Sequence, residues 1–234
     1  GLVGEKSVIH EQIKALICQL TFFHSYHDLE IIAIYDEAYQ EDFQWMRWYP
    51  HFKIHTVNSV AMINSENKRD QILGSLYQIL KDRKQKEEES KKESTFLPHF
   101  LFLIDEPKWI MDHSIMEYLE KEGYNLGFSI IYTSHLRANL PENIGTIAML
   151  KNSEDGLLLI DEREEKQEKF RLHNMQEIPI EWLGRNLGVL EHMQGISAQI
   201  PNSITFFQMY QVERPSQLRI EERWRKNNSS KSLA

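Results

Sequence analysis

The first seven residues, GLVGEKS, carry the residue types of a phosphate-binding loop. The pattern of such a loop is G-x-x-x-x-G-K-[ST], in which backbone N–H groups and the Lys hold phosphates and the hydroxyl reaches Mg²⁺. Lys6 and Ser7 match the last two positions, but Glu5 stands where the pattern has Gly. Gly lets the loop backbone wrap a phosphate with little steric cost. The negative charge of a Glu at ~4–5 Å from a phosphate would weaken phosphate binding by on the order of 1 to a few kcal/mol. Three interpretations stay open: a working nucleotide site, a degenerate one, or a chance Lys-Ser pair.

Two carboxylates, Asp105 and Glu106, follow the apolar run in PHFLFLIDEP (98–107). In nucleotide hydrolases with such a pair after a buried strand, the Asp helps to hold Mg²⁺ and the Glu orients or deprotonates the attacking water. Thr133 and Ser134 end the next apolar run, where a γ-phosphate sensor would lie. The plain alternative is a strand end that happens to be acidic. The order of the segments favours the nucleotide interpretation, with Asp105 as the ligand of any Mg²⁺.

The remaining pattern predicts the elements that would position these side chains. Apolar runs rich in β-branched residues predict strands, and apolar spacings of three and four predict helices. Strands that alternate with helices, each a near-continuous apolar run, predict an α/β fold with a mainly parallel sheet covered on both faces. The strands are expected at 28–37, 53–59, 98–107, 127–134, 144–150 and 156–162, with 28–36, 98–105 and 127–133 at the centre of the sheet.

Three helices are predicted between these strands. The first begins near Ser7 as its N-cap, the second runs from about 66 to 85, and the third from about 112 to 122. The stretch 81–95 has no apolar residue, which indicates a solvated helix end and a loop. An electrostatic docking site in this stretch is the alternative.

Asp36, Asp105, Glu106, Thr133 and Ser134 all follow or end predicted strands. Parallel α/β sheets bind their ligands at the carboxyl ends of the strands. The coincidence of acidic and hydroxyl residues at several strand ends therefore predicts one site at that edge of the sheet.

Composition restricts the function classes. The 234 residues have a net charge of −8, which argues against a domain that grips a nucleic-acid backbone. The single cysteine, Cys18, excludes an internal disulfide and falls in a helical pattern, so a buried small hydrophobe is expected. No apolar run approaches the ~20 residues of a membrane-spanning helix, and the start has no signal peptide. A start without Met suggests a fragment whose membrane anchor, if any, lies outside it.

The aromatic stretch FQWMRWYPHF (43–52) allows two interpretations of equal weight. Trp45 and Trp48 either form an interface with a partner or pack on the core. The ten histidines show no metal-ligand spacing, and structural or surface roles are expected for them. The expected organisation is a main domain at 1–175, a C-terminal extension packing on it at 176–221, and a linker to a following domain at 222–234.

Several stretches together resemble the FtsK/SpoIIIE family of P-loop motor domains, over nearly the whole chain to about residue 162. LEIIAIYDE followed by YPHF is similar to that family's strand ending in Asp and its later Pro-His, and ILGSLYQILKDRKQ to its long helix. HFLFLIDE resembles its Walker B strand, and EGYNLGFSIIYTSHLRANLP its sensor strand and the loop after it. WMRWYPH and GLVGEK narrow the resemblance to the membrane-proximal, divergent ATPase-like domain of EssC/EccC-type type VII secretion proteins of Firmicutes.

The resemblance implies a RecA-like fold and a degenerate nucleotide site made of Lys6, Ser7, Thr133 and Ser134, with Asp105 and Glu106 as Walker B-like residues. It implies a pseudo-ATPase domain at the cytoplasmic side of the bacterial cell membrane, without nucleic-acid partners. The parent protein would bring membrane segments, ATPase domains, secretion subunits and secreted substrates. Glu5, a Ser134 where the family has Gln, and GYNLG without an arginine depart from the family's pattern.

Two rival functions stay open at this point. The first is an active ATPase with an atypical loop, which would bind ATP and Mg²⁺ and power protein export. The second is a DNA-translocating motor domain. The net charge of −8 and the aromatic stretch argue against this second function.

Overall fold

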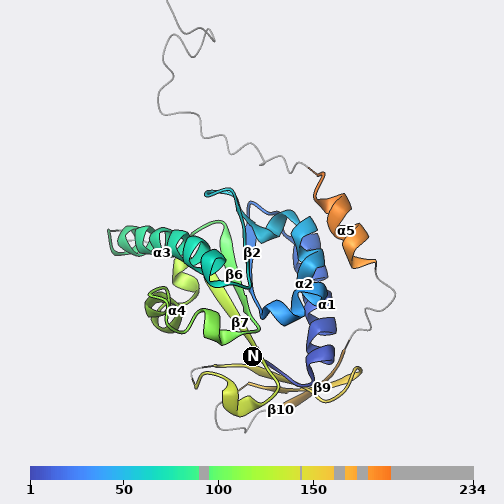
Figure 1. Cartoon of the computed structure of the whole chain (residues 1–234). Coiled ribbons are helices and arrows are strands. Elements are labelled where there is room, and N and C mark those ends of the chain that lie inside the picture. Colours follow the sequence, from blue (N-terminus) through green and yellow to red (C-terminus); the bar gives the residue numbers. More distant parts are fainter. Residues whose placement is uncertain (90–94, 143, 161–166, 173–178, 191–234) are drawn as a thin grey trace, which may run out of the picture. The chain divides into compact units, whose positions relative to one another are not determined.

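A computed structural model of the chain describes residues 1–89, 95–142, 144–160, 167–172 and 179–190 (Figure 1). These residues belong to one compact unit, Gly1–His192, and the second unit, Met193–Ala234, lies outside the described residues. The predicted linker at 222–234 and most of the predicted extension at 176–221 therefore lie outside them too.

Most strands of the described residues form one mixed sheet with the order β10-β9-β8-β1-β7-β6-β2-β5. The pairs from β8 through β1, β7, β6 and β2 to β5 are parallel, and β9 and β10 are added antiparallel. The predicted α/β fold with a mainly parallel sheet is confirmed. The strands are β1 (Leu2–Val3), β2 (Leu29–Ile34), β5 (Met62–Ile63), β6 (His99–Ile104), β7 (Phe128–Ser134), β8 (Ile147–Leu150), β9 (Asp155–Leu159) and β10 (Gln167–Arg171).

Helices cover both faces of the parallel part of the sheet, as the sequence predicts (Figure 1). On one face, α1 (Lys6–Phe23) packs through Ile9, Ile13 and Ile17 against Ile31 and Leu101. The short α2 (Gln40–Phe43) lies on the same face. The other face carries α3 (Glu66–Glu89) and α4 (Met116–Lys121).

The strands β2 and β6 are buried on both faces. Ile31 and Leu101 point into the core under α1, whereas Ile32 and Phe102 point into the core under α3. Successive side chains of a strand alternate between faces, so a strand covered twice is apolar at nearly every position. This is the physical reason for the near-continuous apolar runs. Glu30 of β2 is buried too, and its Oε1 accepts from the backbone N–H of His55 at 3.0 Å.

The strand register aligns the carboxyl ends of four parallel strands. Ile34 of β2 pairs with Ile104 of β6, and Ile104 pairs with Tyr132 of β7. Leu2 of β1 pairs with Thr133 of β7. The residues that follow these strands therefore meet at one edge of the sheet, which is the edge where the sequence predicts a site.

Some local predictions are wrong. The predicted strand at 53–59 is a small antiparallel pair, β3 (Lys53–Ile54) with β4 (Ser59–Val60), because Asn58 takes a left-handed φ of 52° and turns the chain. Ser7 lies inside α1 and is not its N-cap; Glu5 holds that position without a side-chain cap. Cys18 is half-buried, since it lies beside the inner stripe of α1 rather than on it.

The solvated helix end predicted within 81–95 is confirmed, and it runs further than the expected end near residue 85. The α3 helix continues to Glu89, with ion pairs and hydrogen bonds such as Lys84–Glu87 and Gln85–Glu89 along its solvated end. Residues of high helix propensity with partners three or four positions apart extend a helix without any apolar contact. Residues 90–94 lie outside the described residues.

Candidate functional site

The turn from β1 to α1 contains two residues. β1 ends at Val3 and α1 begins at Lys6, so only Gly4 and Glu5 connect them. A Cβ on Gly4 would lie 2.8 Å from the backbone oxygen of Leu150, so the turn presses against the end of β8. The phosphate-binding pattern instead places five residues between its first Gly and its Lys. Residues 2 and 3, which would belong to that loop, are strand residues here, and the predicted match fails in length as well as at Glu5.

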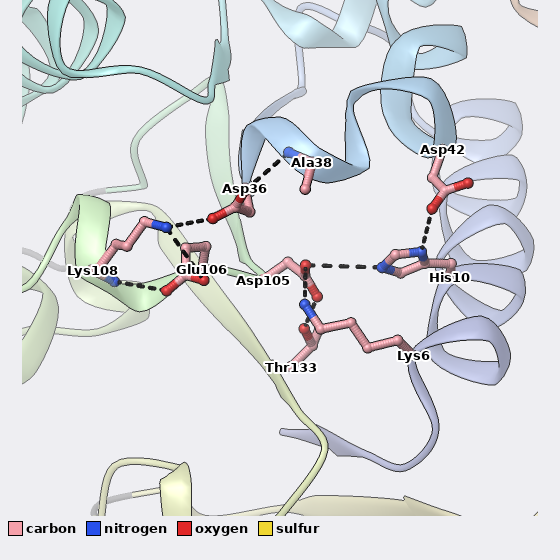
Figure 2. Close-up of polar contacts among 9 residues, drawn as sticks. All are labelled: Lys6, His10, Asp36, Ala38, Asp42, Asp105, Glu106, Lys108 and Thr133. Atoms are coloured by element: carbon pink, nitrogen blue, oxygen red, sulfur yellow. Dashed lines mark hydrogen bonds and ion pairs between the residues drawn. The ribbon is translucent and has the colours of Figure 1, made fainter.

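Lys6 lies at the first position of α1 and points to the end of β6 (Figure 2). Its Nζ is 3.2 Å from Oδ2 of Asp105 and 4.1 Å from the ring centroid of Tyr39. The side chain of Lys6 is 35% exposed and that of Asp105 is 2% exposed. The cation that would hold phosphate is therefore paired with the carboxylate that would hold Mg²⁺.

Asp105 is the centre of the cluster. The hydroxyl of Thr133 donates to its Oδ1 at 2.5 Å, and Nε2 of His10 lies 3.8 Å from its Oδ2, beyond hydrogen-bond distance. Burial alone would raise the pKa of Asp105, but His10, the Thr133 hydroxyl and the Lys6 ammonium together hold this pKa below its usual value. The carboxylate stays ionised because neighbouring donors and charges outweigh its desolvation.

His10 belongs to the site, although it was not among the residues predicted from the sequence. It lies one helical turn after Lys6, and its Nδ1 is 3.3 Å from Oδ2 of Asp42 on α2. Its ring is nearly buried between Tyr39 and Phe43, with centroid distances of 5.3 and 4.7 Å. The spacing of four from Lys6 places both side chains on one face of α1, and this is the one signal that could have revealed it.

Glu106 is separated from Asp105 although the two are adjacent in sequence (Figure 2). Its Oε1 accepts from the backbone N–H of Lys108 at 3.4 Å, and its Oε2 lies 3.9 Å from the Nζ of Lys108. Lys108 also pairs with Asp36, and this hydrogen bond is the main cause that holds the pKa of Asp36 below its usual value. Asp36 and Glu106 thus form a second, exposed group around one lysine, away from Lys6.

The two remaining predicted residues do not join the cluster. Ser7 is exposed on the first turn of α1. The hydroxyl of Ser134 donates to the backbone oxygen of Leu136 at 2.9 Å and accepts from its N–H at 3.2 Å, so it stabilises a local turn. The structure therefore brings together Lys6, Asp105 and Thr133 of the predicted set.

As arranged, the described residues do not fit ATP with Mg²⁺. The two-residue turn offers no loop of N–H groups around a phosphate, and both oxygens of Asp105 already have partners in Thr133 and Lys6. Glu106 faces Lys108 rather than a water next to Asp105. Among the described residues, no three His, Cys, Asp or Glu side chains are placed to hold a metal ion.

The structure separates the two predicted interface residues. Trp45 is 6% exposed and its Nε1 donates to the backbone oxygen of Asp42 at 2.7 Å, so it is a core residue and the interface interpretation is wrong for it. An indole buried by the sheet and α1 has no surface left for a partner. Trp48 is half-buried and lies against α5 (Ile180–Leu187).

The fold is that of a RecA-like ATPase domain. The solved structure of EssC (ATPases 2 and 3) from Geobacillus thermodenitrificans matches with a TM-score of 0.60, over 80% of this chain and 42% of that chain, at 13% sequence identity. At this identity the likeness is evidence for the fold alone, and it agrees with the fold that the sequence predicts.

No family model matches the chain, but curated proteins align along all of it. It is 36% identical over 234 residues both to the ESX secretion system protein EccC of Geobacillus thermodenitrificans (strain NG80-2) and to YukB of Bacillus subtilis (strain 168). It is 35% identical over 235 residues to the type VII secretion system protein EssC of Staphylococcus aureus (strain MSSA476). These alignments cover 99–100% of this chain.

The chain is therefore a homologue of the EssC, EccC and YukB proteins of type VII secretion, as its resemblance implies. It spans 16% of the length of these curated relatives. Within the described ranges, no helix is both long and apolar enough to cross a membrane.

Proposed function

We propose that this chain is a pseudo-ATPase domain of a type VII secretion protein, in which the residues of the former nucleotide site now hold parts of the fold together. Its role is to couple the membrane segment of the parent protein to the ATPase domains that follow, and to support assembly. In this account, the cluster around Asp105 ties α1, β6 and β7 together and does not turn over ATP.

The two-residue turn at Gly4 and Glu5 carries the proposal. Phosphoryl transfer relies on positioning and on charge stabilisation, which the loop, its Lys and the bound metal supply together. A turn this short cannot surround a phosphate, and Lys6 already neutralises Asp105. The loss of two or more such contacts costs several kcal/mol, or about a thousandfold or more in rate at ~1.4 kcal/mol per decade.

An active ATPase is the second candidate, and one observation favours it. Lys6, Asp105 and Thr133 still lie together at the edge of the sheet, and Lys6 is partly exposed. For a nucleotide to bind, Lys6 would have to leave Asp105 and pair with a phosphate instead. A DNA-translocating role has no such support, because the chain carries a net charge of −8.

The partners and the location follow from the homologues in this proposal. Their names place them in type VII or ESX secretion systems. We propose that the domain contacts other domains and subunits of that machinery at the cytoplasmic side of the cell membrane. Attachment to the membrane and access to secreted substrates come through the rest of the parent protein.

A phosphate-release assay on the 234-residue chain tests the absence of catalysis. We expect release from ATP and Mg²⁺ at the level of the protein-free background. Glu5→Gly should not restore activity, because the turn keeps its length. Glu106→Gln serves as the active-site variant and Glu120→Gln, on the exposed side of α4, as its matched control. Robust turnover that Glu106→Gln abolishes and Glu120→Gln leaves intact would overturn the proposal.

The absence of a catalytic role for Glu106 is also tested in the parent protein. If the site is structural, Glu106→Gln in the full-length protein leaves export of the secreted substrates unchanged in a culture-supernatant assay. Export that stops while the variant is present at normal levels would show that the chemistry of Glu106 is required.

A further inference from the structure

Residues 44–52, within the aromatic stretch, form a surface on which a helix packs; this surface is called the seat below. It consists of two 3₁₀ helices, η2 (Gln44–Trp48) and η3 (Pro50–Phe52), joined by Tyr49. Its inner side chains, Trp45, Met46, Tyr49 and Phe52, are buried in the core under α1. Its outer side meets α5, which comes from more than 130 residues later in the chain.

Polar and cationic contacts hold α5 on this seat. The hydroxyl of Tyr49 donates to the backbone oxygen of Ile180 at 2.7 Å. The guanidinium carbon of Arg185 lies 3.6 Å from the ring centroid of Trp48, and Glu181 holds that guanidinium with a 2.7 Å ion pair. The guanidinium carbon of Arg47 lies 4.7 Å from the same ring. A guanidinium on an indole face is among the stronger cation–π arrangements.

Two glycines let the backbone of α5 approach the seat. A Cβ on Gly184 would lie 2.4 Å from Cε2 of Tyr49, and a Cβ on Gly188 would lie 2.8 Å from the backbone oxygen of Trp48. The ring of Tyr49 cannot move away freely, because its hydroxyl is bound to Ile180. Glycine inside a helix costs about 1 kcal/mol relative to alanine, so Gly184 is present at the expense of helix stability.

The helix depends on the seat for its stability. α5 has eight residues, and helices this short are not stable in water by themselves. Among its described residues only Gly184 is buried, while Trp182 is 63% exposed. The contact is therefore shallow, and folding and docking of α5 are one step.

The seat also adjoins the cluster around Asp105. Asp42, the partner of His10, lies just before the seat, and its backbone oxygen accepts from Trp45 within the seat. Loss of α5 from the outer side would loosen the segment that holds Asp42 against His10.

We propose that segment 44–52 is a helix-docking site whose ligand is α5 of the same chain, and that docking of α5 orders the segment from Asp42 to Phe52. The site accepts a short helix with small residues at positions i and i+4 and an arginine that reaches Trp48. This proposal does not depend on whether the strand-end cluster binds nucleotide.

Gly184→Ala in the 234-residue chain tests the docking site by native-state hydrogen exchange. The matched control is Gly74→Ala, inside α3, where a new Cβ meets no atom within 4 Å. Alanine raises helix propensity at both positions, so only steric exclusion from the seat separates them. We expect Gly184→Ala to lower protection at least tenfold in 181–188 and in 42–52, and to leave α3 unchanged. We expect Gly74→Ala to change neither segment.

Two results would overturn the proposal. In the first, α5 of Gly184→Ala keeps its protection, or loses it without any effect on 42–52. In the second, protection of α5 in the wild-type chain rises with protein concentration and sedimentation shows dimers, which would mean that α5 docks on a second copy. A concentration-independent loss in Gly184→Ala alone supports docking within one chain.

Discussion

At the scale of single residues, Asp105 decides what the site can do. A buried carboxylate needs partners, and its two oxygens take them from Thr133 on β7 and Lys6 on α1. The same contacts that make the carboxylate stable in the interior keep it from a metal ion. Stability and nucleotide chemistry therefore compete for the same two oxygens.

Two neighbouring hydroxyls give a matched test of this view. Thr133→Val keeps the shape of the side chain but removes the donor to buried Asp105, and we expect a loss of about 1–3 kcal/mol in the free energy of unfolding. Ser134→Ala removes a hydroxyl whose hydrogen bonds with Leu136 lie within its own turn, and a change within about 0.5 kcal/mol is expected. Urea denaturation measures both. Equal effects would mean that Thr133 does not support the carboxylate.

The pH dependence of Asp105 has a defined sign. The pKa of this group in the folded chain lies below its ordinary value of 3.8, so as the pH falls the unfolded chain takes up the proton first. The ionised form therefore stabilises the fold above the ordinary pKa, and this contribution is lost as the pH falls through the folded pKa. We expect the difference in unfolding free energy between the wild type and Asp105→Asn to shrink as the pH falls below about pH 4. Urea denaturation across this range measures it, and a difference independent of pH would contradict the assignment.

At the scale of elements, Arg83 of α3 forms hydrogen bonds with the residues just before β6 and β7. It is buried, and its guanidinium donates to the backbone oxygens of Leu126, Gly127 and Pro98 at 2.9, 3.1 and 2.6 Å. Burial lowers its pKa to about 10, and its guanidinium carbon lies 4.3 Å from the ring centroid of Phe100.

Removal of this guanidinium should destabilise the whole domain. We expect Arg83→Met to lower the free energy of unfolding by about 3 kcal/mol, because three hydrogen bonds from a charged donor are lost in the interior. Arg69→Met, which removes a surface ion pair with Asp70, is the control and should change it by at most about 0.5 kcal/mol. Chemical denaturation of the two variants decides the point. A similar small effect in both would mean that α3 is held by its apolar face alone.

The elements could be predicted where their cause is local. β2 and β6 are long apolar runs because both of their faces are covered, and the sequence shows this directly. The pair β3–β4 was missed because its turn depends on one left-handed residue, Asn58. The solvated end of α3 was predicted, but its last residue, Glu89, was not, because pairs such as Lys84–Glu87 extend the helix without an apolar period.

The site could be predicted only in part, for a related reason. Asp105 and Thr133 follow apolar runs that mark strand ends, so their edge of the sheet was predictable. His10 joins them through Asp42 and Asp105, which are distant in sequence, and no local pattern encodes that meeting. The length of the turn between β1 and α1 could not be predicted either. β1 has only two residues, Leu2–Val3, which is too short to show the alternating pattern of a strand.

At the scale of the whole molecule, the domain keeps the architecture of an ATPase and uses its key residues for internal contacts. The sheet brings Lys6, Asp105 and Thr133 to one edge, as its fold requires, and they satisfy one another there. The aromatic seat connects this edge to α5 on the other side of the same segment.

Isothermal titration calorimetry of the 234-residue chain with ATP, with and without Mg²⁺, tests the central claim most directly. A site whose lysine and carboxylate neutralise each other, behind a two-residue turn, should show no saturable heat up to millimolar ATP in either condition. Lys6→Ala should give the same flat titration as the wild type. Saturable binding that requires Mg²⁺ and disappears in Lys6→Ala would contradict the account and would make the turn a working nucleotide site.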